Sequence, residues 1–294
     1  MKGGYEMSIQ RFEILNKVVQ LQNITKAAAE LNLSQSGISY AIKNLEEELD
    51  IQLLIRNRSG VTLTSEGERI YQHSLSVTNA YENLIQEAAA IKGIERGTIH
   101  IGTFASVTTN WMPKIITVFK ERFPGITIKI YEDDYQSLEN AVIAGELDCC
   151  FSTISNNKQL VYIPLKKDKL YCIVSNDCPL SKQKVMKISQ IGDYPLIKPK
   201  VGWDNEISDF FSSHKINPAI AYEVSDDQSI IALVQANLGI NIRPGLVLTK
   251  RTPKITVLNL EDDAYRMIGL ATCNQVSHAT QRFISVVTEL FQEI

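Results

Sequence analysis

The chain has 294 residues, 44% of them hydrophobic, and a formal net charge of −3. This length predicts two or three domains, the composition excludes a disordered chain, and no apolar run approaches the roughly 20 residues that would span a bilayer. The charge balance also argues against binding nucleic acid through bulk positive charge, since eight basic and nine acidic residues occur up to residue 70.

The N-terminus and the cysteines carry no functional motif. Met1–Glu6 lacks the apolar core of a signal peptide, so we expect a cytoplasmic protein; because Met7 is an equally good start, residues 1–6 are given no function. The cysteines lack metal-ligand spacing, and the adjacent Cys149 and Cys150 would face opposite sides of a strand. We expect buried, reduced thiols, with a redox-sensing pair as the alternative. The five cysteines are Cys149, Cys150, Cys172, Cys178 and Cys273.

Three helices are predicted in residues 9–49. The first is indicated by apolar residues at helical spacing, namely Ile9, Phe12, Leu15 and Val19. Thr25 is a suitable N-cap for a short second helix that ends at Leu31, and Ser34 is a suitable N-cap for a third helix over residues 35–49. Two helices joined by so tight a turn form a helix-turn-helix.

The third helix has an apolar and a polar face. The apolar stripe consists of Ile38, Ala41, Ile42, Leu45 and Leu49, and the polar face consists of Gln35, Ser36, Ser39, Tyr40 and Lys43. Short or flexible donors and acceptors near a helix N-terminus suit the base edges and phosphates of a DNA major groove. An ordinary solvated helix face would show the same pattern, so this face alone does not decide between the two interpretations.

The segment after this helix favours DNA binding. Residues 53–55 and 61–63 are predicted to pair as a β-hairpin with Arg56 and Arg58 near its tip. A hairpin in this position is a wing, whose arginines can reach phosphate or the minor groove. A long helix follows from Ser65 to about Lys92, with a heptad seam typical of a helix that pairs with a partner. The seam positions are Ile70, Ser74, Val77, Tyr81, Leu84, Ala88 and Ile91.

Residues 9–67 resemble the N-terminal domain of the LysR-type transcriptional regulators. The matching strings are residues 23–28 (NITKAA), 34–39 (SQSGIS) and 63–67 (LTSEG), together with Leu31, Ile42, Leu45, Glu46, Leu49 and Arg56. The chain departs from the family pattern at Gly37, Asp50 and Leu54, where the family prefers Ala, Gly and Phe. The resemblance implies that the DNA-binding residues are Thr25, Ser34, Gln35, Ser36, Ser39, Tyr40, Lys43, Arg56 and Arg58.

From Gly97 onward, strands and helices alternate, which predicts α/β units with mostly parallel sheets. Strands are expected at residues 98–102, 126–130, 147–151, 170–175, 195–198, 220–224 and 239–243. Helices are expected at residues 111–123, 137–144, 204–213 and 228–237.

This second region resembles the periplasmic-binding-protein-like effector domain of the same family, through residues 97–102 (GTIHIG), 119–126 (FKERFPGI), 145–148 (GELD) and 238–240 (LGI) with Pro244. The predicted fold class is therefore α/β, with an all-α-type winged helix-turn-helix domain (residues 7–64), a linker and dimerisation helix (65–93) and a two-lobed, doubly wound effector domain (95–294). Lobe 1 is expected at about 95–168 and 268–294, and lobe 2 at about 169–267. A ligand would lie between the lobes.

Residues 103–109 (TFASVTT), where a strand runs into a helix, offer hydroxyls and free backbone N–H groups to an anion. Simple helix capping by Ser106 or Thr108 is the alternative. The resemblance implies an effector site formed by Thr103, Ser106, Tyr135, Thr153, Lys198 and Arg243. A carboxylate partner suits Arg243, with a surface salt bridge as the alternative. Trp203 is either a stacking residue or part of the core.

We expect neither an enzyme nor a metal or cofactor site. The four histidines (His73, His100, His214 and His278) are scattered, and the turn at Gly102 lacks the glycine spacing of a nucleotide site. A solute-binding transport protein would share the fold of residues 95–294, but the winged helix-turn-helix and the missing export signal oppose it. The predicted partners are double-stranded DNA, a small anionic effector and a second copy paired through the linker helix. The resemblance adds a tetramer, and RNA polymerase is a further candidate. The effector, the operator and the direction of regulation stay open.

Overall fold

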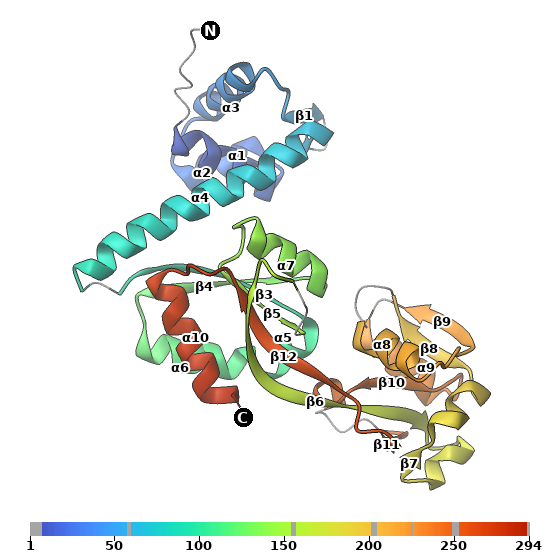
Figure 1. The fold of residues 1–294 in the computed structure, drawn as a ribbon. Helices are drawn as coiled ribbons and strands as arrows, with labels where there is room; N and C mark the ends of the chain where they lie inside the picture. Colours follow the sequence, from blue (N-terminus) through green and yellow to red (C-terminus); the bar gives the residue numbers. More distant parts are fainter. Residues whose placement is uncertain are drawn as a thin grey trace.

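Three regions follow one another along the chain: a small helical head, one long helix and a two-lobed α/β region (Figure 1). The computed structural model describes residues 8–57, 60–93, 95–153, 157–200, 205–224, 226–248 and 253–292. The predicted fold class of a winged helix-turn-helix, a linker helix and an α/β effector domain is confirmed. The predicted domain boundaries stay a prediction. Lobe 1 denotes residues of about 95–168 and 268–294, and lobe 2 denotes residues of about 169–267.

The head consists of α1 (Ile9–Leu21), α2 (Ile24–Leu31), α3 (Gln35–Leu49), β1 (Leu54–Asn57) and β2 (Gly60–Leu63). The two strands pair antiparallel, as predicted for a wing. The three helices enclose a core in which Leu15, Ile38 and Ile42 are fully buried. Apolar spacing therefore located the first helix, and the proposed caps placed the other two to within two residues.

The start of α2 differs from the prediction. Asn23 is its N-cap, and the Asn23 Oδ1 accepts a hydrogen bond from the backbone N of Lys26 at 2.9 Å. The prediction that Thr25 caps this helix is wrong, because the helix already begins at Ile24 and Thr25 lies in its first turn. Asn is at least as good an N-cap as Thr, and it stands two residues earlier.

Helix α4 (Ser65–Ile91) has 27 residues, which corresponds to about 40 Å. Its N-cap is Thr64, whose Oγ1 accepts a hydrogen bond from the backbone N of Gly67 at 2.8 Å. The first turns pack on α1, and the helix then continues along lobe 1 (Figure 1). It connects the head to the first strand of the effector domain.

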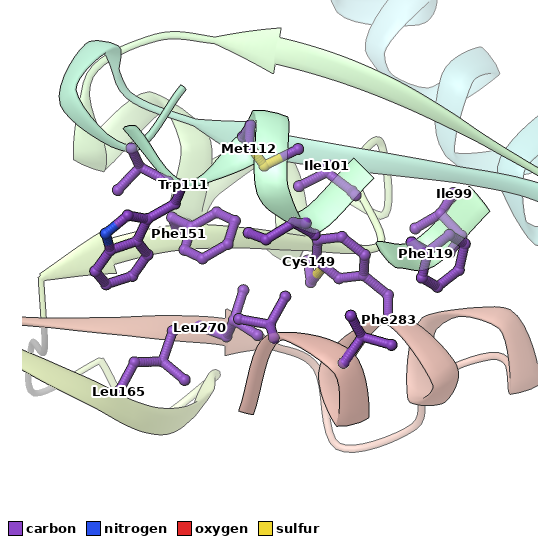
Figure 2. Packing of buried hydrophobic residues seen from close by; sticks show 14 of the residues in the cluster. Ile99, Ile101, Trp111, Met112, Phe119, Cys149, Phe151, Leu165, Leu270 and Phe283 are labelled. Atoms are coloured by element: carbon purple, nitrogen blue, oxygen red, sulfur yellow. The ribbon is translucent and has the colours of Figure 1, made fainter. Parts of the chain in front are cut away.

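Lobe 1 has helices on both faces of its sheet. Its elements are β3 (Gly97–Thr103), α5 (Ala105–Asn110), α6 (Met112–Arg122), β4 (Ile126–Glu132), α7 (Tyr135–Ile143), β5 (Cys149–Thr153) and α10 (His278–Phe291). One face carries the aromatic core shown in Figure 2, which includes Phe119, Phe151 and Phe283. Adjacent Cys149 and Cys150 belong to the cores on opposite faces, as predicted for a strand. All five cysteines are free thiols, and only Cys273 is not fully buried.

Lobe 2 is built around the other end of the same large sheet. Its elements are β7 (Val185–Met186), β8 (Leu196–Pro199), α8 (Asn205–Ser213), β9 (Ile220–Val224), α9 (Asp227–Gln235), β10 (Asn241–Pro244) and β11 (Ile255–Leu260). Three 3₁₀-helices at Pro179–Lys182, Ile188–Asp193 and Gly245–Leu248 connect them. Strands β8 and β9 form a small parallel sheet beside the large one.

Two long strands join the lobes, and they correct the prediction of mostly parallel sheets. The strands β6 (Val161–Ser175) and β12 (Tyr265–Thr272) run antiparallel, because one carries the chain into lobe 2 and the other returns it. The large sheet has the order β4-β3-β5-β12-β6-β11-β7, with β10 also on β6. Among its described strands, only β3 with β4, β3 with β5 and β7 with β11 pair in parallel. The sheet is therefore mixed.

Further differences concern single elements. The predicted helix at 111–123 corresponds to α6, and a separate short helix, α5, precedes it and meets it at Trp111. Pro113 follows in the first turn of α6, where its missing N–H costs no hydrogen bond, so a new helix starts there. The sequence analysis also missed β7, β11, β12 and α10, and it found only the second half of β6.

Candidate functional site

Helix α3 presents the polar face that its sequence predicts. The Ser34 Oγ caps the helix by accepting a hydrogen bond from the backbone N of Gly37 at 3.0 Å. The apolar stripe is buried against α1 and α2. The polar face therefore points outward: Gln35, Ser36, Tyr40 and Lys43 are exposed, and Ser39 is half-buried. A helix held in this way can enter a DNA groove with its N-terminal donors.

A hollow of about 540 Å³ separates α3 from the wing. It is lined by Ser39, Tyr40, Lys43, Glu46, Gln52, Leu54 and Arg56. The fold thus brings three of the predicted DNA-binding residues of α3 together with Arg56 on β1. Thr25 and Ser34 are exposed at the starts of α2 and α3. Arg58, at the predicted tip of the wing, lies outside the described residues.

The acidic run at the end of α3 is engaged within the head. Glu46 Oε1 accepts hydrogen bonds from the backbone N of Leu53 at 2.8 Å and of Leu54 at 3.0 Å, which fixes the start of the wing. Glu47 pairs with Lys43 at 3.2 Å, and Glu48 pairs with Arg11 at 2.5 Å. These contacts explain how a head without net positive charge can still present donors to an acceptor-rich surface.

Two faces of α4 differ in chemistry. One face contacts lobe 1 through side chains that donate to it: Ser76 to Ala144 O, Asn79 to Gly145 O at 2.8 Å, Asn83 to Asp148 Oδ1 at 3.2 Å and Gln86 to Thr98 O at 2.8 Å. The predicted seam lies on another face, and from Val77 onward it is exposed at every position, including Tyr81 and Leu84. An exposed apolar seam on a long helix is suited to pairing with a second helix.

A cavity of about 870 Å³ lies between the two lobes. Lobe 1 contributes residues from α5 and from the β4–α7 turn, and lobe 2 contributes residues from α8, α9 and β10. Its apolar lining includes Phe104, Ile207, Ile230, Ile231 and Val247. A concave, mostly apolar space with a few placed polar groups is the usual form of a small-molecule site.

Three of the six predicted effector residues line this cavity: Ser106, Tyr135 and Arg243. The other three lie elsewhere, so their positions do not match the prediction. Thr103 is fully buried in β3 and contacts Thr108. Thr153 ends β5 outside the lining, and the Lys198 Nζ donates to Ser208 Oγ at 3.4 Å. Trp203 lies outside the described residues.

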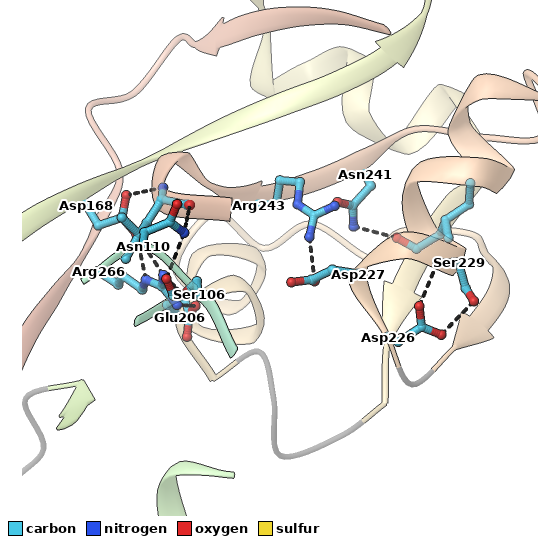
Figure 3. A network of polar contacts seen from close by, with 12 residues as sticks. Ser106, Asn110, Asp168, Glu206, Asp226, Asp227, Ser229, Asn241, Arg243 and Arg266 are labelled. Atoms are coloured by element: carbon cyan, nitrogen blue, oxygen red, sulfur yellow. Dashed lines mark hydrogen bonds and ion pairs between the residues drawn. The ribbon is translucent and has the colours of Figure 1, made fainter. Parts of the chain in front are cut away.

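Arg266, on β12, lies where the cavity meets Ser106 and Tyr135 of lobe 1 and is only 5% exposed (Figure 3). Its Nε donates to Asp168 Oδ2 at 2.9 Å, and its Nη2 donates to Ser106 Oγ at 2.9 Å and contacts Asp168 Oδ2 at 2.8 Å. Its Nη1 donates to Tyr135 Oη at 2.8 Å and to Glu206 Oε1 at 3.5 Å. The guanidinium thereby joins lobe 1, the strand β6 and helix α8 of lobe 2.

The electrostatics of this cluster favour a permanently charged Arg266. Burial alone lowers the pKa of the guanidinium, but the oxygens of Tyr135, Glu206 and Asp168 more than offset it, so the pKa is raised. Burial also raises the pKa of the Tyr135 phenol, which keeps its proton. The Phe104 ring lies 5.1 Å from the guanidinium carbon, in cation–π range.

Arg243, on β10, lies on the lobe 2 side and is only 3% exposed (Figure 3). Its Nη2 donates to Asp227 Oδ1 at 2.5 Å, whereas its Nε and Nη1 have no partner among the described residues. Burial lowers the pKa of this guanidinium, although Asp227 opposes the shift. Asn241, two residues earlier on the same strand face, donates to Ile197 O at 2.8 Å, and its buried Oδ1 has no partner in the described chain.

Sequence reasoning missed Arg266, Asp227, Glu206 and Asn241. The pattern offers one signal for Asn241, which stands at the alternate position to Arg243 on a strand whose residues are all buried. The sequence around Arg266 or Glu206 contains no pattern that indicates a site, because the residues they contact are distant in sequence.

No group of three or more His, Cys, Asp or Glu side chains within the described ranges could hold a metal ion. Among the described helices, none combines the length and apolarity needed to cross a membrane.

Comparisons with known proteins agree with this architecture. The model for the "LysR substrate binding domain" matches residues 92–292, and that for the "bacterial regulatory helix-turn-helix protein, lysR family" matches residues 9–68. The chain is 29% identical over 290 residues to the uncharacterized HTH-type transcriptional regulator YvbU of Bacillus subtilis (strain 168), which covers 97% of this chain and 99% of that protein. It is 28% identical over 276 residues to the HTH-type transcriptional regulator BenM of Acinetobacter baylyi, covering 91% and 90%.

Solved structures show the same fold. The full-length structure of CbnR in complex with its target DNA superimposes with a TM-score of 0.72, covering 96% of this chain and 99% of that one, at 21% identity. Full-length BenM gives a TM-score of 0.61 at 25% identity, covering 97% and 96%. With both family models matched and nearly the whole chain covered, this protein belongs to the LysR family of DNA-binding transcriptional regulators and is not an enzyme.

Proposed function

We propose that this regulator contacts double-stranded DNA with α3 and the wing, and that it responds to a small effector anchored on Arg243 in the cavity between its lobes. The observation that carries the proposal is the buried Arg243 guanidinium, two nitrogens of which have no partner among the described residues, at a cavity of ligand size. A buried donor without a partner is costly, and a ligand acceptor would satisfy it. An anionic group on the effector suits this position.

The proposed DNA contacts are Thr25, Ser34, Gln35, Ser36, Ser39, Tyr40, Lys43, Arg56 and Arg58. Support comes from the exposure of the α3 face and from the hollow that α3 shares with Arg56. Side chains near the N-terminus of such a helix contact base edges, whereas wing arginines contact the backbone.

We infer that two copies pair through the exposed seam of α4, and that two such dimers form a tetramer. A single head contacts only one half-site, so paired heads at a fixed separation are needed for a palindromic operator. We place the protein in the cytoplasm, where RNA polymerase is a further partner. Closure of the lobes on the effector would change the angle between paired heads.

The proposed effector ligands are Ser106, Tyr135 and Arg243. Ser106 and Tyr135 already contact Arg266, so their role toward the effector runs partly through that side chain. Thr103, Thr153 and Lys198 are not included, because they do not line the cavity.

The DNA contacts are tested by footprinting and gel shift on the region upstream of the protein's own gene. Gln35→Ala with Ser39→Ala should relax sequence preference, whereas Arg56→Ala should weaken all sites evenly and lower the salt slope by about one per protomer. Lys120→Ala removes an exposed charge from α6 and is the matched control. Absence of salt-sensitive, sequence-specific binding by the wild type would refute the DNA-binding proposal.

The effector anchor is tested by native mass spectrometry of the purified chain. A small molecule should copurify with the wild type and with Lys120→Ala, and it should be absent from Arg243→Gln. Equal retention by Arg243→Gln would exclude Arg243 as the anchor.

A further inference from the structure

The wall of the cavity between the lobes carries an excess of negative charge. Carboxylates outnumber guanidiniums by five to two among its lining residues, which include neither lysine nor histidine within the described chain. The carboxylates are Glu132, Asp134, Glu206, Asp226 and Asp227. A purely anionic effector would enter against this surplus, even though Arg243 offers it a cation.

Part of the surplus is compensated locally. Asp134 and Asp226 are N-caps, each accepting hydrogen bonds from the backbone and side chain of the serine three residues later. A helix N-terminus stabilises such a carboxylate. Glu206 and Asp168 both contact the single Arg266 guanidinium.

On the lobe 2 side, the cavity wall also presents both hydrogen-bond donors and a hydrogen-bond acceptor that lack partners among the described residues. Within the described part of the chain, two buried nitrogens of Arg243 have no acceptor and the buried Oδ1 of Asn241 has no donor. Both residues are on β10, and Asp227, which is 40% exposed at its side chain, lies against Arg243. A simple carboxylate would satisfy Arg243, would leave the Asn241 Oδ1 without a donor and would compete with Asp227 for the guanidinium.

A ligand with both charges meets all of these conditions. We propose that the effector is a zwitterion of the amino-acid type with an apolar side chain, whose carboxylate binds Arg243 and whose ammonium binds Asp227 and Asn241 Oδ1. The apolar remainder would contact the lining of Phe104, Ile207 and Ile231. This inference rests on the proposed function, since it assumes that the cavity holds the effector.

The test is isothermal titration calorimetry of the full chain with matched triads. Each triad consists of an amino acid, the acid without its amino group and the amine without its carboxylate. The first is leucine with 4-methylpentanoate and 3-methylbutylamine; the others start from phenylalanine and from tryptophan. In at least one triad we expect the amino acid to bind about tenfold or more tightly than both analogues, because each analogue loses one charge-assisted contact.

Two variants that each remove one charge separate the two contacts. Arg243→Gln should weaken the amino acid and the des-amino acid alike. Asp227→Asn should weaken the amino acid by about tenfold but leave the des-amino acid equally tight or tighter, since a competitor for Arg243 is removed. Lys120→Ala is the control. Both variants should bind operator DNA without effector, which shows that they are folded.

The outcomes distinguish the inference from the function on which it rests. The zwitterion proposal would be overturned if a des-amino acid bound as tightly as its amino acid, or if no member of the three triads bound. The proposed function would survive either result, provided that the wild type still bound DNA and that Arg243→Gln still lost the copurified ligand. If those two results also failed, the proposed function itself would be wrong.

Discussion

Two buried arginines line the same cavity, and they differ in how many hydrogen-bond acceptors surround their guanidinium groups. Arg266 is surrounded by acceptors from three parts of the chain, whereas Arg243 contacts one carboxylate and keeps two nitrogens without a partner among the described residues. Their exposed fractions, 5% and 3%, do not distinguish them. The difference teaches that burial of a charge does not indicate its role; the number of acceptors that the fold supplies does.

The largest expected difference between the two arginines is the loss of stability when each guanidinium is removed in turn. Arg266→Gln removes the guanidinium that the buried Asp168 and Glu206 side chains both contact, and we expect a loss of about 3–5 kcal/mol in the free energy of unfolding. Arg243→Gln leaves only Asp227, which water can reach, and removes two donors that have no partner in the described ranges, so its unfolding free energy should stay within about 1 kcal/mol of the wild type. Urea titration measures both.

Arg266→Lys serves as the control for this pair. A lysine keeps the charge but cannot contact partners on several sides as a guanidinium does, so its loss should fall between those of the two Gln variants. Equal destabilisation by Arg266→Gln and Arg243→Gln would remove the distinction between a structural and a ligand-binding arginine.

Ser106 sharpens the comparison, because it lines the cavity and also accepts a hydrogen bond from Arg266. If it serves Arg266, Ser106→Ala should lower the unfolding free energy by about 1.5 kcal/mol or more, as for a hydrogen bond to a buried charge. The affinity for the tightest amino acid should then change by less than about threefold. Calorimetry and urea titration on one preparation give both values.

The opposite result is equally informative. A stable Ser106→Ala variant with an affinity reduced tenfold would make Ser106 a direct effector ligand, as the resemblance to the family implies. Thr109→Ala, at the same cavity wall but without a hydrogen bond to Arg266 among the described contacts, is the matched control.

Local signals made the head predictable from sequence. Helices α2 and α3 begin at caps whose side chains contact backbone only three residues away, as Asn23 does with Lys26 and Ser34 with Gly37. The one wrong cap, Thr25 instead of Asn23, resulted from two suitable side chains standing two residues apart. The wing and α4 followed from turn chemistry and heptad spacing, which are also local.

Long-range contacts made the cavity hard to predict. Arg266 contacts Glu206, Asp168, Tyr135 and Ser106, which are 60, 98, 131 and 160 residues away in sequence. An arginine in a strand would ordinarily be placed on a solvated face, and β12 itself was missed. Arg243 was found because it follows an apolar strand at a position that the resemblance marked. Its partner Asp227, on another element, was not.

The smallest expected effect concerns the helix that carries Asp227. Asp226 caps α9, and its bonds from Ser229 Oγ at 2.6 Å and Ser229 N at 2.8 Å lower the pKa of its carboxyl group. Asp226→Ala should fray the first turn of α9, and with it the contact between Asp227 and Arg243. A modest decrease in Tm at neutral pH should therefore be accompanied by weaker amino-acid binding, while Arg266 and its partners are unaffected.

The pH dependence of this effect has a definite sign. Because the folded pKa of Asp226 is lower than the unfolded value of about 3.9, the cap stabilises the protein above that value, and the stabilisation is lost as the pH falls through the folded pKa. The difference in Tm between wild type and Asp226→Ala should be constant from about pH 6 to 8 and should shrink below about pH 4. Ser229→Ala, which removes the hydroxyl bond and keeps the backbone bond, should show an intermediate decrease. A difference that grew on acidification would mean that Asp226 stabilises α9 in its protonated form, and Asp226 would then be excluded as the charged cap of the helix that carries Asp227.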